Sequence, residues 1–508
     1  MERNPRRWLI LVVLCLSTLV LVIDNMVLTV AIPSITADLG ATAQDIQWII
    51  DSYILVFAGL LLTAGSLSDK FGRRKTMIVG LVLFGAASVL ATYATSPDQL
   101  ILGRTLMGIG GALIMPSTLS ILITVFDEDE RPKAIAAWSA VAMVGLVGGP
   151  VLGGALIAHF SWGVVFLINV PIAILAIVAA LVLMPESKGP WRKADPVGMV
   201  LSMAGMTALV WTIIELPKAG LDHTGTQLSL AVAVASLAGF AIWETRCDAP
   251  MVPLSLFRNK TFTGASFSLV LLTFANGGLL LILTQYLQFV MGYTPTETGF
   301  AFAPMAVAVI VFNSIGAALL PRTGNRFMAV AGLLVIAAGF AALATLSEGD
   351  GWGLLATAML LMGAGGGLAM PAVISALMGA VPTEHAGVGS ALNDTIQQAG
   401  AALGVAILGA VLSGTYTDRM DSAPEGARSS IADALALGDG SVAEAARSAF
   451  TSAMSTSFWA GAAGVVVAAV LASVLMSGRE QERAAAAEAA AEAASPAEGT
   501  AREAAPVG

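Results

Sequence analysis

The sequence has few charged residues, since Asp, Glu, Lys and Arg make up 12% of its 508 residues. An average soluble protein carries about twice that share. Cysteine and histidine are also scarce, with two and three residues, and the histidines lie far apart in the chain. There is no cluster of metal ligands and no phosphate-binding loop of the Gly-Lys-Ser/Thr type. The sequence therefore gives no support for an enzyme, for a metal or other cofactor, or for ATP as the energy source.

Apolar residues fill the chain instead. They account for 57% of it, and the mean hydropathy is +0.83. A helix that crosses a bilayer needs about 20 mostly apolar residues. Fourteen runs of this kind are predicted as spans of an all-α membrane protein: 8–31, 46–66, 76–95, 100–125, 134–157, 164–184, 197–216, 227–245, 262–290, 298–320, 327–346, 353–378, 387–412 and 453–476.

The distribution of Lys and Arg predicts how these helices are oriented. Cytoplasmic loops of membrane proteins carry an excess of these residues. Both ends of the chain and alternate loops hold most of them, whereas the other side has only Lys218, Arg419, Arg428 and Arg447. We therefore expect a multi-pass protein of the inner (cytoplasmic) membrane, in contact with lipid and with both termini cytoplasmic. The first span is too long for a cleavable signal.

Two segments do not have the pattern of a span. Residues 413–452 are predicted to form a long polar external loop, and residues 477–508 an Ala/Glu-rich cytoplasmic tail that is either a solvated helix or disordered. Much of the net charge of −9 lies in these two segments. The charge therefore does not indicate a nucleic-acid partner.

Several motifs occur in order at fixed helix positions. The sequence resembles the fourteen-helix drug:proton antiporter branch of the major facilitator superfamily over most of residues 8–476. The resemblance rests on five motifs. They are a loop at 65–75 that contains Gly65, Asp69, Gly72 and Arg73, a motif at 104–111 that begins with Arg104, and a glycine-rich segment of the fifth span at 145–154. The other two are a first-span segment at 24–33 that begins with an Asp and a pattern at 162–171 that runs from a Trp to a Pro.

The resemblance implies two six-helix bundles, residues 8–184 and 262–476, joined by an additional helix pair at 197–245. The bundles would be related by an axis along the membrane normal, with the substrate bound between them near the midplane. It also implies a monomer that exchanges protons for a small amphipathic or cationic compound. In the second half, residues 321–326 occupy the place of the first motif but have no acidic residue.

The loop between the second and third spans combines glycines with opposite charges. Gly65 and Gly72 permit a close approach or a sharp turn, and Asp69 can accept hydrogen bonds from Arg73 or from the N-terminus of a neighbouring helix. A role as a positive-inside anchor explains the basic residues but not Asp69. The resemblance implies that these contacts hold the cytoplasmic side shut in one state.

The fifth span carries Gly145, Gly149 and Gly153 on one helix face, so that another helix can approach closely. Pro150 removes a backbone hydrogen bond and is expected to kink the helix. Close packing of helices alone explains this pattern, to which the neighbouring Gly154 also belongs. The resemblance marks the motif as one of exporters, where it would seal the interface against proton leak.

Ionisable residues inside spans cost at least about 2.5 kcal/mol each at the bilayer centre, so we treat them as functional candidates. Asp24 would be away from water, which disfavours its ionised form, and a proton and a cationic substrate would compete for it. A local helix-bending hydrogen bond is the alternative.

Four more ionisable residues lie in spans. Arg104 can satisfy backbone carbonyls, pair with a carboxylate or alter its protonation, and the resemblance ties it to proton coupling. Asp394 is the strongest acidic candidate of the second half. Asp51 lies either in the outer vestibule or at the interface, and Glu215 lies in the additional pair, away from the expected cavity.

Polar groups in the ninth span suit loose recognition of amphipathic molecules: Asn276, Gln285, Tyr286 and Gln288. The leading hypothesis is thus proton-driven drug efflux by alternating access. Export of one metabolite or antibiotic made by the host is an alternative, and a non-transporting membrane receptor is another, although no signalling domain is present. Uptake by symport is disfavoured by the glycine motif.

Overall fold

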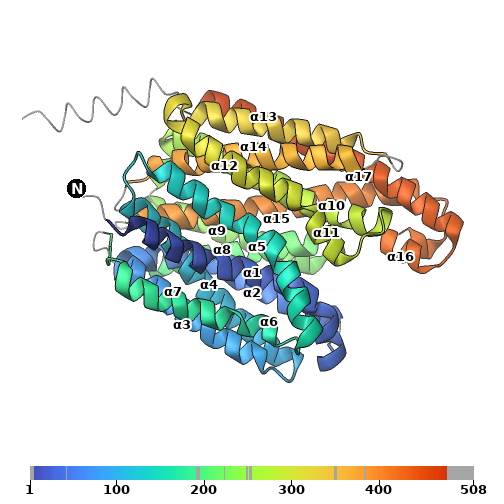
Figure 1. The fold of residues 1–508 in the computed structure, drawn as a ribbon, viewed down its shortest axis with the longest axis horizontal. Helices are drawn as coiled ribbons and strands as arrows, with labels where there is room; N and C mark the ends of the chain where they lie inside the picture. The colour runs from blue at the N-terminus through green and yellow to red at the C-terminus, as the bar shows by residue number, and fades with distance from the viewer. Residues whose placement is uncertain are drawn as a thin grey trace, which may run out of the picture.

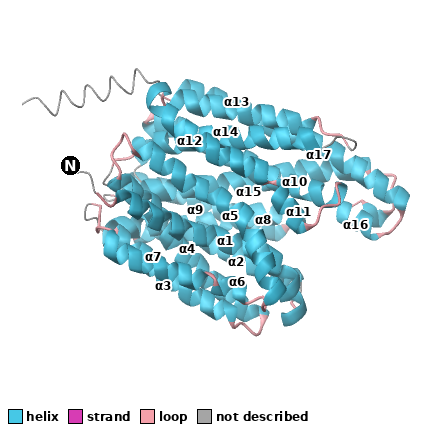
Figure 2. Ribbon diagram, in the orientation of Figure 1, coloured by secondary structure: helices cyan, strands magenta, loops and turns pink. Residues whose placement is uncertain are grey.

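The fold is that of a computed structural model, which describes residues 5–41, 43–189, 195–221, 223–247, 250, 254–347, 352–382, 385–428 and 430–476. Within these ranges every regular element is helical (Figure 2). The predicted all-α class is therefore confirmed. The predicted tail at 477–508 lies outside the described residues.

The helices follow one another with short connections. The first half contains α1 (Arg7–Leu39), α2 (Ala43–Phe71), α3 (Arg73–Thr92), α4 (Pro97–Val125), α5 (Arg131–His159), α6 (Val164–Leu167), α7 (Asn169–Leu183), α8 (Pro196–Ala219) and α9 (Thr224–Arg246). The second contains η1 (Leu254–Arg258), α10 (Lys260–Gln285), η2 (Tyr286–Val290), α11 (Pro295–Ala301), α12 (Ala303–Thr323), α13 (Asn325–Ala344), α14 (Trp352–Gly379), α15 (Ala386–Arg419), η4 (Glu425–Ala427), α16 (Ile431–Ala436) and α17 (Gly440–Leu475).

Each of the fourteen predicted spans falls on helical structure. Among the described residues, 12 helical segments are long and apolar enough to cross a membrane. α5 and α8 lie at the two remaining predicted spans and contain 29 and 24 residues. These lengths suffice for a hydrocarbon layer of about 30 Å. The chain is thus a multi-pass membrane protein.

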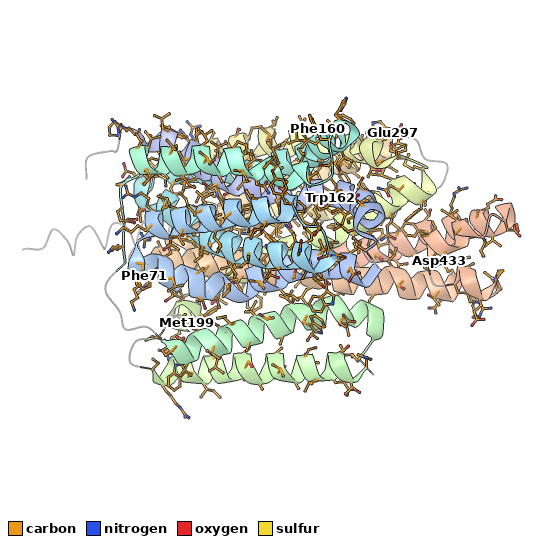
Figure 3. The ribbon with its side chains drawn as sticks, turned by 90° about the horizontal axis from the view of Figure 1, so that it is seen from below. Phe71, Phe160, Trp162, Met199, Glu297 and Asp433 are labelled. Atoms are coloured by element: carbon orange, nitrogen blue, oxygen red, sulfur yellow. The ribbon has the colours of Figure 1, made fainter. Side chains whose placement is uncertain are left out.

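The helices gather in two groups (Figure 1). In the first, α4 packs against α2 and α3, and α1 packs against α5; in the second, α14 packs against α12 and α13, and α10 packs against α15 and α17. The groups meet where α2 and α4 contact α15 and where α5 contacts α12 and α14. α8 and α9 form a pair beside α2 (Figure 3). The division at 8–184, 197–245 and 262–476 stays a prediction.

One end of the helix bundle carries a cluster of basic residues. Phe71 and Met199 lie at one end in Figure 3, and Trp162 and Glu297 lie at the other. The basic cluster at residues 73–75 follows Phe71 closely in the chain. We therefore name the end with Phe71 the basic end, and the other the opposite end.

Local sequence signals explain where helices begin and end. Ser96 caps α4 by accepting a hydrogen bond from the backbone N–H of Gln99, and Pro97 follows at the first helical position, where its missing N–H is harmless. α1 ends at Gly40, whose φ of 61° lies in the left-handed region that favours glycine.

The structure corrects the prediction of a polar loop at 413–452, because much of this segment is helical. α15 continues to Arg419 and α17 begins at Gly440, with η4 and α16 between them. Asp439 caps α17, and hydrogen bonds from the Ser441 side chain and the backbone lower the pKa of its carboxyl. The extensions project at the opposite end near Asp433 (Figure 3). Apolar runs could not reveal them, because a helix outside the bilayer needs no continuous apolar surface.

Glycines let the backbones of α10 and α15 approach each other closely at two points. A Cβ at Gly404 would overlap the carbonyl group of Phe274, and one at Gly277 would overlap the carbonyl group of Ala401. Small residues at helix contacts allow this approach in membrane proteins, where close packing replaces the hydrophobic effect as a driving force.

We predict that Gly404→Ala destabilises the protein, because the added methyl group forces α10 and α15 apart; overpacking of this kind costs about 1–3 kcal/mol. Thermal unfolding of the purified protein in detergent measures the effect. Gly414→Ala in the same helix is the control, because a Cβ there meets no atom within 4 Å. Equal melting temperatures for the two variants would contradict the packing account.

Candidate functional site

A buried ion pair joins α1 to α4 in the first half. Arg104 is 0% exposed and Asp24 is 2% exposed. The Arg104 Nη1 atom donates a hydrogen bond to Asp24 Oδ2 across 2.5 Å. An isolated charge in an apolar interior is very unfavourable, and an opposite charge within hydrogen-bond distance offsets most of that penalty. The pair therefore explains how two ionisable residues are tolerated inside spans.

The rest of the Arg104 guanidinium is held by groups from α1 and α2. Its Nε donates to the carbonyl oxygen of Ile49 at 3.2 Å, and Nη2 donates to Asn25 Oδ1 at 3.3 Å. The guanidinium carbon lies 4.3 Å from the centroid of the Tyr53 ring, a cation–π arrangement. Arg104 thus pairs with a carboxylate and also satisfies a backbone carbonyl, as two of the expectations for it stated.

The second oxygen of Asp24 is also occupied. Asn169, at the start of α7, donates from Nδ2 to Asp24 Oδ1 at 2.8 Å and lies 3.3 Å from Ser88 Oγ. Both oxygens of Asp24 thus accept hydrogen bonds in this structure, and its role in proton and substrate coupling stays a prediction.

The glycine face of α5 packs on the α1 segment that carries Asp24. A Cβ at Gly149 would overlap the Met26 side chain, and one at Gly153 would lie 2.9 Å from Val27 Cγ1. Gly145 approaches Val22 in the same way. These three glycines thus form the predicted close helix contact.

Gly154, the last glycine of the motif, does not take part in this close contact. Gly154 has no atom within 4 Å of an added Cβ. α5 continues as a helix through position 150, but the side chain of Pro150 lies outside the described residues.

The second half contains a carboxyl group in a different environment. Asp394 lies about two turns inside α15 and is 2% exposed. Its Oδ1 accepts a hydrogen bond from Asn393 Nδ2 at 2.9 Å. Its Oδ2 has no hydrogen-bond partner within the described ranges. Unlike Asp24, this carboxyl faces no Lys or Arg at ion-pair distance in that part of the chain.

Further polar atoms near Asp394 are also unpaired. The buried atoms Ser390 Oγ, Asn393 Oδ1, Thr395 Oγ1 and Gln397 Nε2 have no hydrogen-bond partner among the residues that are described. Buried polar groups in folded proteins are paired with protein or with water. Such a cluster on one helix therefore provides sites for a proton, for water or for the polar groups of a ligand.

At the basic end, Asp69 connects the two halves. Gly387 and Val388, at the start of α15, donate their backbone N–H groups to the Asp69 carboxylate at 3.0 and 3.1 Å. Arg73 donates to the same carboxylate from Nε at 2.9 Å and from Nη2 at 2.8 Å. A carboxylate is favoured at a helix N-terminus, where free N–H groups and the helix dipole are positive.

Glycines permit this contact between the halves. A Cβ at Gly65 would lie 2.5 Å from Ala391 Cβ, and one at Gly387 would lie 2.5 Å from Asp69 Oδ1. Gly72 adopts a φ of 118°, which other residues rarely adopt, and so turns the chain from α2 into α3. The predicted residues of this loop are thus brought together, with α15 as their partner.

The chain after α7 holds this loop in place. Glu186 accepts hydrogen bonds from the backbone N–H groups of Arg74 and Lys75 at 3.1 and 3.2 Å. Arg73 N donates to the Ser187 carbonyl at 2.9 Å, and Gly189 N donates to the Asp69 carbonyl at 2.9 Å. The segment that leads toward α8 therefore caps α3 and fixes the turn at the basic end.

The remaining predicted site residues lie in η2, α10 and α2. Tyr286 is 2% exposed and begins η2, a π-helical segment that packs against α10, α11 and α17. Gln285 ends α10 and Gln288 lies in η2; both are half-buried, and their part in substrate recognition stays a prediction. Asn276 is half-buried in α10, and Asp51 is half-buried in α2.

Three partners escaped sequence reasoning. Asn169 was noted only as part of a motif, although a polar amide at the start of an apolar span signals an interhelical hydrogen bond. Asn25 follows Asp24 directly, and Glu186 lies just outside a span, where charge is unremarkable. Within the described part of the chain, no group of three His, Cys, Asp or Glu residues is placed to hold a metal ion.

Comparison with known proteins gives consistent matches. The family model described as Major Facilitator Superfamily matches residues 14–405. The tetracenomycin C resistance and export protein of Streptomyces glaucescens is 32% identical, and the alignment covers 92% of this chain and 91% of that protein. The multidrug efflux pump LfrA of Mycolicibacterium smegmatis is 34% identical, with 82% and 84% covered.

The puromycin resistance protein pur8 of Streptomyces alboniger is 37% identical, with 81% of this chain and 83% of its own covered. Among solved structures, the human organic anion transporter MFSD10 has a TM-score of 0.62 at 14% identity, with 92% of this chain and 100% of that chain covered. The structural match supports the fold alone.

We predict that Asp24→Leu destabilises the protein by about 3–5 kcal/mol, because it leaves the Arg104 charge buried without its partner. The double variant Asp24→Leu/Arg104→Met should recover most of this loss, since both charges are gone. Thermal unfolding in detergent compares the three proteins. A double variant less stable than Asp24→Leu would contradict the pairing account.

Proposed function

Because the chain belongs to the Major Facilitator Superfamily, we propose that it is a proton-coupled exporter of small amphipathic compounds that works by alternating access. The multi-pass architecture and the distribution of Lys and Arg support a place in the cytoplasmic membrane, with the basic end and both termini in the cytoplasm. In this proposal the protein is a monomer, takes up protons from outside and releases the compound there.

The names of its relatives support export rather than uptake. They include a tetracenomycin C resistance and export protein, a multidrug efflux pump and a puromycin resistance protein. These matches extend over more than four fifths of this chain and of each relative. We extend drug or antibiotic efflux to this chain on that basis.

The observation that carries the proton part of the proposal is the contrast between Asp24 and Asp394. Asp24 has a guanidinium on one oxygen and an amide on the other. Asp394 has one oxygen unpaired among the described groups and no neighbouring cation there. A buried carboxyl without a counterion favours its neutral form and gains or loses a proton as its surroundings change. Asp394 is therefore our candidate proton carrier.

Exchange then follows from competition at one carboxyl. In the state open to the outside, a proton from the external solution neutralises Asp394 and the substrate leaves. In the state open to the cytoplasm, the proton departs and the carboxylate attracts a cationic or hydrogen-bonding substrate. Burying an ionised carboxylate without either partner is unfavourable, so movement of the empty, charged transporter is suppressed.

The basic end supplies the switch between the two states. Asp69 accepts hydrogen bonds from the N-terminus of α15, which belongs to the other half. Opening the basic end must break these bonds and leave the carboxylate to Arg73. We propose that the Asp69–α15 contact stabilises the state closed to the cytoplasm, and that the Asp24–Arg104 pair keeps α1, α2, α4 and α7 together as one body.

Export of a single metabolite is a second candidate. A tetracenomycin C export protein and a probable actinorhodin transporter are among the relatives. Each of these names refers to a single compound. A panel of structurally unrelated compounds distinguishes the two, since a dedicated exporter moves one class and a multidrug exporter moves several.

We predict that Asp394→Asn reduces transport driven by a pH gradient to the rate without a gradient, because the amide cannot take up the proton. Substrate–substrate exchange without a gradient should persist, since it needs no proton movement. Proteoliposomes loaded with a compound that the wild type moves measure both. Asp98→Asn, in the first turn of α4 and exposed, is the matched control. Gradient-driven transport at the wild-type rate in Asp394→Asn would overturn the assignment.

We further predict that Asp69→Asn lowers efflux several-fold at normal protein levels in the membrane. The neutral amide loses charge-assisted hydrogen bonds, which are about twice as strong as neutral ones, and the state closed to the cytoplasm becomes less populated. Efflux from cells, corrected for protein amount, is the measurement. Glu128→Gln, exposed just after α4, provides the control. Unchanged efflux in Asp69→Asn would show that this contact does not control the switch.

A further inference from the structure

A polar cavity lies at the opposite end of the second half, away from the clusters described above. Its volume is about 540 Å³, and it is open to the outside of the molecule. The lining comes from the end of α13 and the residues after it, from α15 and from α17: Ala344, Thr345, Leu346, Ser347, Arg419, Ser448, Thr451, Ser452, Ser455 and Thr456. This size is ordinary for a ligand site.

The lining combines one cation with many hydroxyl groups. The Arg419 side chain has no hydrogen bond or ion pair to any described residue, and no Asp or Glu is among the described residues of the lining. Thr345, Thr451 and Ser455 donate their hydroxyl protons to backbone carbonyls. Their oxygens therefore remain as acceptors. The cavity thus suits a ligand with an oxyanion for Arg419 and hydroxyl groups for the threonine and serine oxygens.

Helix lengths place the cavity at the surface of the hydrocarbon layer. The candidate span of α13 ends at Ala344, which lines the cavity. Thr456 is the last α17 residue in the lining, and α17 continues from there to Leu475. At about 1.5 Å per residue this part of the helix is about 30 Å long. One bilayer core has about that thickness. The cavity therefore opens at the level of lipid headgroups.

An apolar stripe continues from the cavity along α17. Ser452 and Thr456 line the cavity. Trp459, Val466 and Val470 follow Thr456 at successive spacings of three, seven and four residues, which place them on the same helix face. Trp459 is 53% exposed, and Val466 and Val470 are 44% and 56% exposed. From Trp459 to Val470 the stripe is about 16 Å long, roughly the depth of one leaflet.

We propose that this cavity binds the headgroup of an anionic glycerophospholipid, of the phosphatidylglycerol class, in the leaflet at the opposite end. The phosphate pairs with Arg419, the glycerol hydroxyls donate to the side-chain oxygens of Thr345 and Thr451, and an acyl chain lies along the stripe on α17. The ligand would join α13, α15 and α17. This inference goes beyond the transport function and does not depend on it.

Native mass spectrometry of the full-length protein in detergent tests the proposal with phosphatidylglycerol and phosphatidylethanolamine of identical acyl chains. The wild type should retain the anionic lipid about fivefold better, because one Arg at the membrane surface contributes about 1 kcal/mol. Arg419→Gln should abolish this preference. Ser448→Phe should also abolish it, because the ring fills the cavity from an exposed position without removing charge.

The matched control is Arg447→Gln, which removes an exposed positive charge from the same part of α17 but does not line the cavity. It should keep the preference. Equal retention of both lipids by the wild type, or a preference that survives in both Arg419→Gln and Ser448→Phe, overturns the proposal. So does displacement of the lipid by an equal concentration of sn-glycerol 3-phosphate, which would assign the cavity to a soluble anion.

Discussion

A charge inside this helical bundle needs a partner, because neither lipid nor packed side chains replace the water that it loses. Asp24 has Arg104 and Asn169. Asp69 has Arg73 and the free N–H groups at the start of α15. Each carboxylate thus fixes the relative position of helices that are distant in the sequence, the first within one half and the second between halves. Asp394 meets this requirement only in part, since its Oδ2 has no partner among the described groups.

Close helix contacts are the second condition for this arrangement, because side-chain hydrogen bonds are short. α1 reaches α5 across Gly145, Gly149 and Gly153, and α2 reaches α15 across Gly65. A larger residue at any of these positions would separate helices whose polar groups must meet within about 3 Å. Glycine at these helix contacts therefore acts as a spacer of minimal size, whereas Gly72 is needed for its positive φ.

The sequence predicted most of the fold but only part of the site, for a physical reason. Long apolar runs and charge clusters reflect the bilayer, which acts on every span in the same way. Pairing between helices leaves no periodic pattern, so the roles of Asn169 and Glu186 emerged only from the structure. The helical extensions at 413–452 were missed because their stability does not come from a continuous apolar run.

α15 combines the two features on which the proposed mechanism depends. Its first residues bind Asp69, and Asp394 lies six residues beyond Val388, about 9 Å along the same helix axis. A helix of this length moves largely as a rigid rod, so a shift that releases its N-terminus from Asp69 also changes the surroundings of Asp394. A neutral Asp394 can be buried at a lower free-energy cost than an ionised one. Protonation of Asp394 would therefore favour positions of α15 in which this side chain is buried. Proton occupancy and closure of the basic end would then be linked through one helix, without a longer chain of intermediate residues.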